Sequence, residues 1–177
     1  MTPPPATSRL YVAIGCMGLA TSCVRPARPS VLTREEYLRA QTDSVAPIKA
    51  ALLQALPRYE HRWTANGPAN YRFRLRRSCY CVEQPVAEVA VWGGTVTQVR
   101  DTTGAMLPDT IWRRYAYTVP ELFALIRRDI GSDVWSVSAE FDQRFGFPSH
   151  IVVENLEISD AGEHLDVTDF TELTTVP

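Results

Sequence analysis

The chain has 177 residues, of which 45% are hydrophobic and 21% charged, a balance typical of ordinary globular proteins. Its formal net charge of −2 gives no reason to expect a nucleic-acid partner. Once an N-terminal export segment is subtracted, the remaining length suffices for one domain with a hydrophobic core and is too short for two.

The chain begins with the features of a bacterial export signal. A polar start with one basic residue is followed by an uncharged apolar run over residues 10–20, which is too short to span a bilayer but typical of a secretory signal. The run ends in Ala20-Thr21-Ser22-Cys23, which is similar to the lipobox of bacterial lipoproteins. We therefore predict a signal peptide over residues 1–22 and lipidation at Cys23. Cleavage before Cys16, an ordinary cleaved signal peptide and an uncleaved helix are the alternatives.

A helical segment is predicted next. Residues 23–32, with two prolines and two arginines, predict an extended tether, and the domain is expected over 33–177. Thr33 and Glu36 have the spacing of a capping box. Pro47 is expected to end or restart the helix, and Pro57 to kink or break it. An apolar face is predicted from the spacing of Ile48, Leu52, Leu56, Tyr59 and Trp63.

The remainder of the chain predicts two groups of strands with a helix between them. Apolar and basic residues alternate from Tyr71 to Arg76, which predicts a half-buried strand over 70–78, and a hairpin over 86–99 turns at Gly93-Gly94. Residues 101–114 show no period and are expected to form a loop. Thr118 and Glu121 form a second capping box, and the helix it opens is expected to end at Gly131. Three more strands are predicted, over 135–141, 151–156 and 165–170.

The order is thus helix, three strands, helix, three strands. Because short connections favour antiparallel neighbours, we predict an α+β fold with a mostly antiparallel sheet of about six strands, an N-terminal helical segment and one central helix.

Four stretches of the chain carry a resemblance to a known family. In order, they are Tyr71-x-Phe73 leading to Ser78-Cys79-Tyr80-Cys81, Val91-Trp92-Gly93-Gly94-x-Val96, Thr118-Val119-x-Glu121-Leu122-Phe123 and Phe141-Asp142-x-x-Phe145-Gly146-Phe147-Pro148. Together they resemble the bacterial domain-of-unknown-function family 6174 over about residues 63–170. The resemblance implies an exported or lipid-anchored bacterial protein. It implies no catalytic role, because the family has no assigned activity.

Cys79 and Cys81 are the residues of the sequence with the most distinctive chemistry. In an oxidising compartment, two otherwise unpartnered thiols tend to pair. A flat strand would place their Cα atoms about 6.6 Å apart, near the upper limit for a disulfide, so closure requires a bulge at Tyr80. A local disulfide, two buried thiols, and a redox or metal site remain the alternatives.

Arginines dominate the basic residues, and the charge is unevenly distributed. Residues 1–132 carry a net +7 and residues 133–177 a net −9. Arg72, Arg74 and Arg76 form one side of the predicted strand and are candidates for binding an acidic ligand. The simpler prediction is that they pair with Glu154, Asp166 or Asp169 on a solvated sheet face. Asp142 is a further binding candidate, although an aspartate that opens a turn usually bonds its own backbone.

The sequence favours a binding or structural module over an enzyme. It contains no phosphate loop, nucleophile elbow or close pair of carboxylates. The histidines His61, His150 and His164 lack the spacing of a zinc site, although His150 and His164 fall on neighbouring predicted strands. We expect a non-enzymatic module of the bacterial cell envelope, held at the membrane by its lipid and able to contact an envelope protein, with no cofactor, metal or nucleic acid. A thiol-redox or metal-handling protein that uses Cys79 and Cys81 is the alternative.

Overall fold

The computed structural model describes residues 33–79, 85–132, 134–154 and 162–174. Every described residue belongs to one compact unit, Leu32–Pro177. The predicted signal peptide, Cys23 and the tether lie outside the described residues. No helix within the described ranges is both long and apolar enough to cross a membrane.

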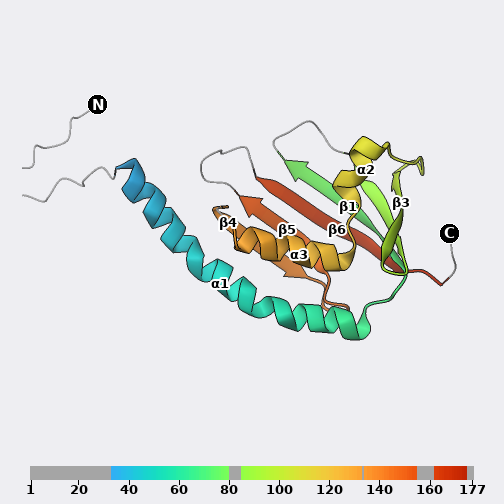
Figure 1. Cartoon of the computed structure of the whole chain (residues 1–177), viewed down its shortest axis with the longest axis horizontal. Helices are drawn as coiled ribbons and strands as arrows, with labels where there is room; N and C mark the ends of the chain where they lie inside the picture. Colours follow the sequence, from blue (N-terminus) through green and yellow to red (C-terminus); the bar gives the residue numbers. More distant parts are fainter. Residues whose placement is uncertain (1–32, 80–84, 133, 155–161, 175–177) are drawn as a thin grey trace, which may run out of the picture. The chain divides into compact units, whose positions relative to one another are not determined.

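Three helices and six strands make up the described part of the chain (Figure 1). The predicted α+β class is confirmed, with one helix more than expected. The elements are α1 (Arg34–Asn66), β1 (Tyr71–Cys79), β2 (Ala87–Trp92), β3 (Thr95–Asp101), α2 (Asp109–Tyr115), α3 (Val119–Ile130), β4 (Ser136–Phe141), β5 (Pro148–Glu154) and β6 (Glu163–Glu172).

The six strands form one antiparallel sheet in the order β3-β2-β1-β6-β5-β4. The first three strands and the last three are each neighbours in sequence, and the two groups meet where β1 pairs with β6. The hairpin between β2 and β3 turns at Gly93 and Gly94, whose φ angles of 57° and 78° are those a primed turn requires. The predicted hairpin is therefore confirmed.

All three helices pack on the same face of this sheet. Tyr71, Phe73 and Leu75 of β1 point to this face and are at most 2% exposed, which confirms the predicted alternation. They share one hydrophobic cluster with residues of every helix and of the other five strands. The helical members that are fully or nearly fully buried are Leu52, Leu56, Tyr115, Val119, Leu122, Phe123, Leu125 and Ile126.

α1 is a single helix, so the expectation that Pro47 would end or restart it is wrong, and Pro57 does not break it. Proline removes one helical hydrogen bond, which leaves the carbonyl four residues earlier without its donor. Both prolines are exposed, as are Asp43 and Leu53 four positions before them, so water can solvate the carbonyls.

The predicted apolar face of α1 is correct except at its start. Leu52 and Leu56 are buried, and Tyr59 and Trp63 are partly buried against the core, whereas Ile48 is 52% exposed. Val45 is buried in place of Ile48, because it lies seven residues, or two full turns, before Leu52 and so on the same side of the helix.

Both predicted capping boxes are present. The Thr33 hydroxyl accepts a hydrogen bond from the Glu36 amide, and the Glu36 carboxylate accepts one from the Thr33 amide at 2.8 Å. Thr118 and Glu121 repeat this arrangement at the start of α3. The first backbone N–H groups of a helix have no acceptor within the helix, and here side chains supply one.

The predicted loop over 101–114 is wrong in its second half, where α2 forms. A seven-residue helix is too short to show a clear period, and no side chain caps its start. Tertiary packing holds it instead, because Tyr115 is fully buried and its hydroxyl donates to the Pro85 carbonyl at 2.7 Å.

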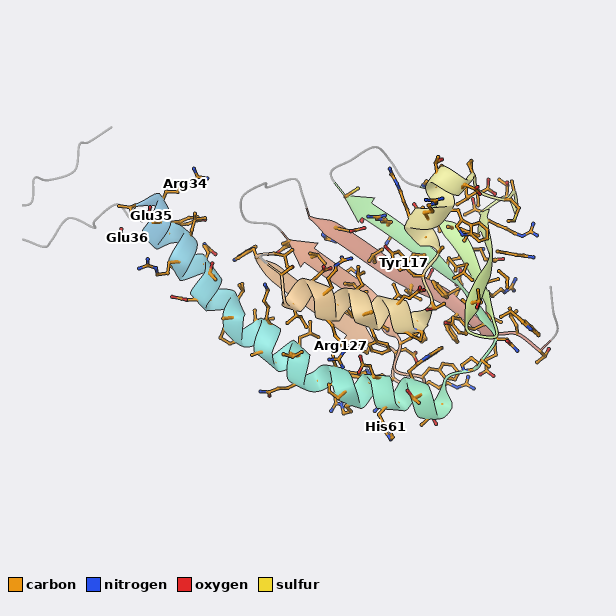
Figure 2. All side chains as sticks on the ribbon, in the orientation of Figure 1. Arg34, Glu35, Glu36, His61, Tyr117 and Arg127 are labelled. Atoms are coloured by element: carbon orange, nitrogen blue, oxygen red, sulfur yellow. The ribbon has the colours of Figure 1, made fainter. Side chains whose placement is uncertain are left out.

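Helices α1 and α3 are joined by an ion pair. Arg127 of α3 donates to the Glu60 carboxylate of α1 through two guanidinium nitrogens, Nε at 2.8 Å and Nη2. Figure 2 shows Arg127 between the two helices and His61 pointing away from the sheet.

Candidate functional site

The face of the sheet opposite the helices is lined by polar and charged side chains. We call it the open face and define it by the outward residues of each strand, which the register of the pairs identifies. They are Thr95, Gln98 and Arg100 of β3, Glu88, Ala90 and Trp92 of β2, Arg72, Arg74, Arg76 and Ser78 of β1, His164, Asp166, Thr168, Asp169 and Thr171 of β6, His150, Val152 and Glu154 of β5, and Ser136, Ser138 and Glu140 of β4.

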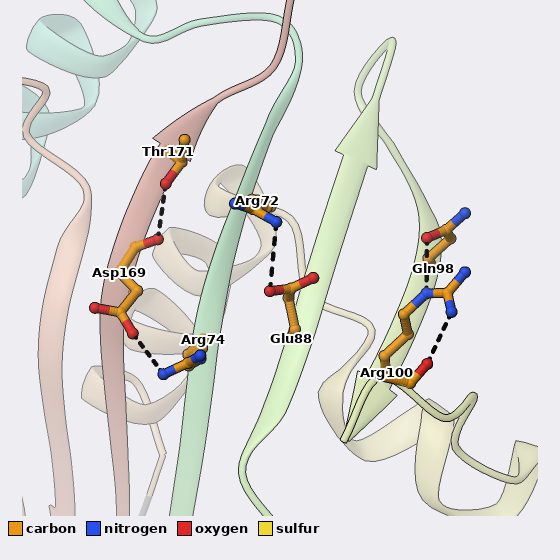
Figure 3. Close-up of polar contacts among 8 residues, drawn as sticks. Arg72, Arg74, Glu88, Gln98, Arg100, Asp169 and Thr171 are labelled. Carbon is orange, nitrogen blue, oxygen red and sulfur yellow. Dashed lines mark hydrogen bonds and ion pairs between the residues drawn. The ribbon is translucent and has the colours of Figure 1, made fainter. Parts of the chain in front are cut away.

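The three arginines of β1 lie in the middle of the open face, and each pairs with an acid on a neighbouring strand. Arg74 lies 2.9 Å from the Asp169 carboxylate and Arg76 2.9 Å from that of Asp166, both on β6. The predicted pairing with C-terminal acids is confirmed for these two. Arg72 instead approaches Glu88 of β2, at 3.7 Å (Figure 3).

These ion pairs are solvated rather than buried. The side chains of Arg72, Arg74 and Arg76 are 48%, 47% and 64% exposed. Exposed pairs of this kind contribute only about 0–1 kcal/mol each to stability. Their arrangement therefore sets the electrostatic character of the surface more than it stabilises the fold.

Asp166 is the most constrained group on the open face. Its carboxylate bonds His150 Nδ1 at 2.6 Å on one side, and Nε and Nη2 of Arg76 at 3.0 and 2.9 Å on the other. Partial burial raises the pKa of Asp166, but the hydrogen bonds and charges of His150 and Arg76 outweigh this, and the net pKa lies below the ordinary aspartate value.

The bond to Asp169 depends on an irregularity in β6. The register between β1 and β6 shifts between Arg72 and Arg74, and Asp169 has a φ of 52°. Aspartate adopts this left-handed conformation more readily than most residues. The bulge keeps Phe170 in the aromatic cluster with Tyr71 on the helix side, while Asp169 pairs with Arg74 on the open face.

His150 and His164 lie close together on neighbouring strands, as their predicted positions suggested. Their ring centroids are 6.1 Å apart, in an edge-to-face arrangement. Among the described residues, no group of three or more histidine, cysteine, aspartate or glutamate side chains could hold a metal ion.

Asp142 serves the fold in this structure. Its carboxylate accepts hydrogen bonds from the amides of Arg144, at 3.0 Å, and Phe145, as expected of an aspartate that opens a turn. The turn lies against α1, because Arg62 donates to the Gln143 carbonyl at 2.9 Å.

The turn requires a glycine at position 146. Its φ is 85°, and a Cβ at this position would lie only 2.7 Å from the Tyr59 carbonyl oxygen. The stretch from Phe141 to Pro148 therefore packs the β4–β5 hairpin closely against α1. The stacked rings of Phe141 and Tyr59, whose centroids are 4.0 Å apart, reinforce this contact.

Tyr71 has a structural role that its spacing did not reveal. Its hydroxyl accepts a hydrogen bond from the buried Val119 amide at 2.9 Å, so β1 holds the first turn of α3. Burial, which disfavours the phenolate, raises the pKa of Tyr71 to about 12.

Cys79 is the last residue of β1, opposite Glu163 of β6. Cys81 lies outside the described residues, so their disulfide stays a prediction.

A family model described as a family of unknown function (DUF6174) matches residues 55–172. This range runs from the second half of α1 to the end of β6 and includes the whole sheet. The chain belongs to the DUF6174 family. No curated protein and no solved structure matches it.

The matched DUF6174 range contains all four stretches that carried the resemblance. Where the structure describes them, their side chains mainly serve the fold. Tyr71 and Phe73 are core residues, Gly93 and Gly94 form a turn, Thr118 and Glu121 cap a helix, and the last stretch docks on α1.

Proposed function

We propose that this protein is a lipid-anchored binding module of the bacterial cell envelope, and that it contacts another protein through the open face. The observation that carries the proposal is the large, charged face of the sheet that the helices leave exposed. A sheet needs only one covered face to be stable, so the second face is available for contacts.

The composition of the open face fits a polar and reversible contact. Exposed arginines are favoured at protein interfaces because a guanidinium forms several directed hydrogen bonds to carboxylates. Asp169 and Asp166 on β6 hold Arg74 and Arg76 in place and thereby reduce the entropy lost on binding. The face has few apolar side chains, which favours transient association over an obligate complex.

The location rests on the N-terminal sequence, where an uncharged apolar run ends at Cys23. Acyl chains on Cys23 would hold the domain at the membrane, and two or more chains make such anchoring stable. Mass spectrometry of the full-length protein from membranes tests this. We expect a mature N-terminus at acylated Cys23, and an intact Met1 or a soluble product beginning elsewhere would contradict it.

The contact can be tested by photo-crosslinking in cells. A photoreactive residue at Arg74, on the open face, should capture a specific protein after irradiation. The matched control is Arg39 of α1, which is also exposed but lies on a helix and away from the open face. Equal products from both positions, or none from Arg74, would contradict the proposal.

A further inference from the structure

The charge of the open face changes sign across the middle of the sheet. The outward residues of β3, β2 and β1 carry four arginines and one glutamate, a net +3. Those of β6, β5 and β4 carry Asp166, Asp169, Glu154 and Glu140, a net −4 without the histidines. The boundary falls between β1 and β6. The charge asymmetry of the sequence, +7 before residue 133 and −9 after it, thus becomes a basic and an acidic half of one surface.

Charges that lack an opposite partner lie near the two edges of this face. Arg100 on β3 bonds Gln98 and the Gly104 carbonyl (Figure 3), and no acid in the described part of the chain pairs with it. At the other edge, Glu140 makes no ion pair with any described residue, and Glu154 bonds only the Ser136 hydroxyl. The open face therefore leaves one positive charge on its first strand and two negative charges on its last two strands.

This pattern satisfies the condition for self-association with two-fold symmetry. Consider two sheets that face each other, with a two-fold axis between them that is parallel to the strands and passes over the β1–β6 boundary. This axis reverses the strand order, so β3 of one copy lies over β4 of the other, and β1 lies over β6. Each basic half then faces an acidic half. A two-fold axis across the strands would instead place like charges together.

Resting on the function proposed above, we propose that the partner of the open face is a second copy of this chain, in a symmetric face-to-face pair. Arg100 of each copy then faces Glu140 of the other. Along the strands, Arg100 is level with Arg74 and Glu140 with Arg76, as the register shows. The two positions differ by about 6.6 Å, or two residues, which long side chains can span.

The size of the face fits a weak pair. Six strands spaced about 4.8 Å apart and about 23 Å long cover about 650 Å² per copy. The pair would bury about 1,300 Å², near the lower end for specific complexes. Membrane anchoring favours such a pair, because tethering raises the effective concentration of one copy near another. Since the attraction is between exposed charges, it is weakened by salt.

A reciprocal charge exchange tests the pair in the full-length, membrane-bound protein. The photoreactive residue at Arg74 reports dimer-sized product, identified as two copies by mass spectrometry. R100E and E140R each replace an attraction by a repulsion at two symmetric contacts, and each should lower the dimer yield by about tenfold. The double variant R100E/E140R restores both attractions and should recover the yield, as should co-expression of the two single variants. R39E, which changes the charge away from the open face, should leave the yield unchanged.

The outcomes separate this inference from the proposed function. Recovery by the double variant supports the pair and shows that neither single change merely prevents folding. Dimer that is insensitive to R100E and E140R would overturn the two-fold arrangement. Capture of other proteins without dimer would overturn self-association while leaving a binding function for the open face. Absence of any product specific to position 74 would overturn both.

Discussion

Replacement of Tyr71 by phenylalanine tests the link between β1 and α3. The hydroxyl accepts a hydrogen bond from the Val119 amide, and the tyrosine side chain and Val119 are both almost completely buried. Tyr71→Phe removes this acceptor with little change in volume and leaves a buried amide unpaired. Such a loss costs about 1–3 kcal/mol. Thermal and urea unfolding of the full-length protein at pH 7 should therefore show a loss of this size.

The pH dependence of the same variant provides a second test. Because the folded pKa of Tyr71 is raised to about 12, above its ordinary value of 10.0, the folded state holds the proton more tightly than the unfolded state. This contribution to stability is fully present below pH 10 and is lost as the pH rises toward 12. At 1.36 kcal/mol per pKa unit it amounts to about 2–3 kcal/mol. The stability difference between wild type and Tyr71→Phe should therefore shrink over this range.

The matched control is Tyr37→Phe, because Tyr37 is 50% exposed and makes no side-chain hydrogen bond among the described residues. It should change the free energy of unfolding by less than about 0.5 kcal/mol. If Tyr71→Phe were equally mild, or if its difference from wild type did not depend on alkaline pH, the assigned hydrogen bond would be wrong.

Three further predictions concern the core, the Asp166 cluster and the cysteines. Phe73→Ala should destabilise by about 3–5 kcal/mol as a core truncation, whereas Arg74→Ala should cost less than about 1 kcal/mol, and thermal melts in the opposite order would refute the assignment of faces. The folded pKa of Asp166 is lowered, so the stability that its carboxylate contributes is present above the unfolded value of 3.8 and is lost as the pH falls through the folded pKa. Asp166→Asn should therefore lose less stability than the wild type as the solution is acidified. Urea midpoints that fall equally in both proteins below pH 4 would contradict this role of Asp166. Protein isolated from the envelope without reductant should show no titratable thiol at Cys79 and Cys81. Replacement of both by serine should lower the free energy of unfolding by less than about 2 kcal/mol. Two free thiols would exclude the disulfide.

Local signals in the sequence predict much of the fold. Alternation at Tyr71, Phe73 and Leu75 identifies the buried side of β1 because side chains in a strand alternate between faces. The capping boxes at Thr33 and Thr118 identify both long helix starts because their hydrogen bonds span only three residues.

The errors arise where tertiary structure decides the outcome. Pro47 disfavours helix locally, yet α1 continues through it because the freed carbonyl is exposed to water and the opposite side of the helix packs on the sheet. The helix α2 has too few residues for a periodic signal, and the burial of Tyr115 holds it in place.

The candidate surface was predictable only in part. The alternation of β1 places Arg72, Arg74 and Arg76 on one side, and the sequence predicts acids of the C-terminal strands as their partners. The partners of Arg74 and Arg76 depend on the pairing of β1 with β6, between residues about 90 positions apart in the sequence. The bulge at Asp169 also follows from this long-range register, which no local pattern specifies. The bond between Asp166 and His150 follows from the pairing of β5 with β6.

Arginine-specific chemical labelling of the unmodified protein tests the central claim about the open face most directly. The full-length protein is labelled in native membranes, at low salt and at about 1 M salt, which screens charges beyond about 3 Å. Mass spectrometry then compares Arg74 and Arg76 with Arg39. If a partner covers the open face, Arg74 and Arg76 should be protected at low salt and become reactive at high salt, while Arg39 reacts in both. Equal reactivity of all three arginines under both conditions would contradict a contact through this face.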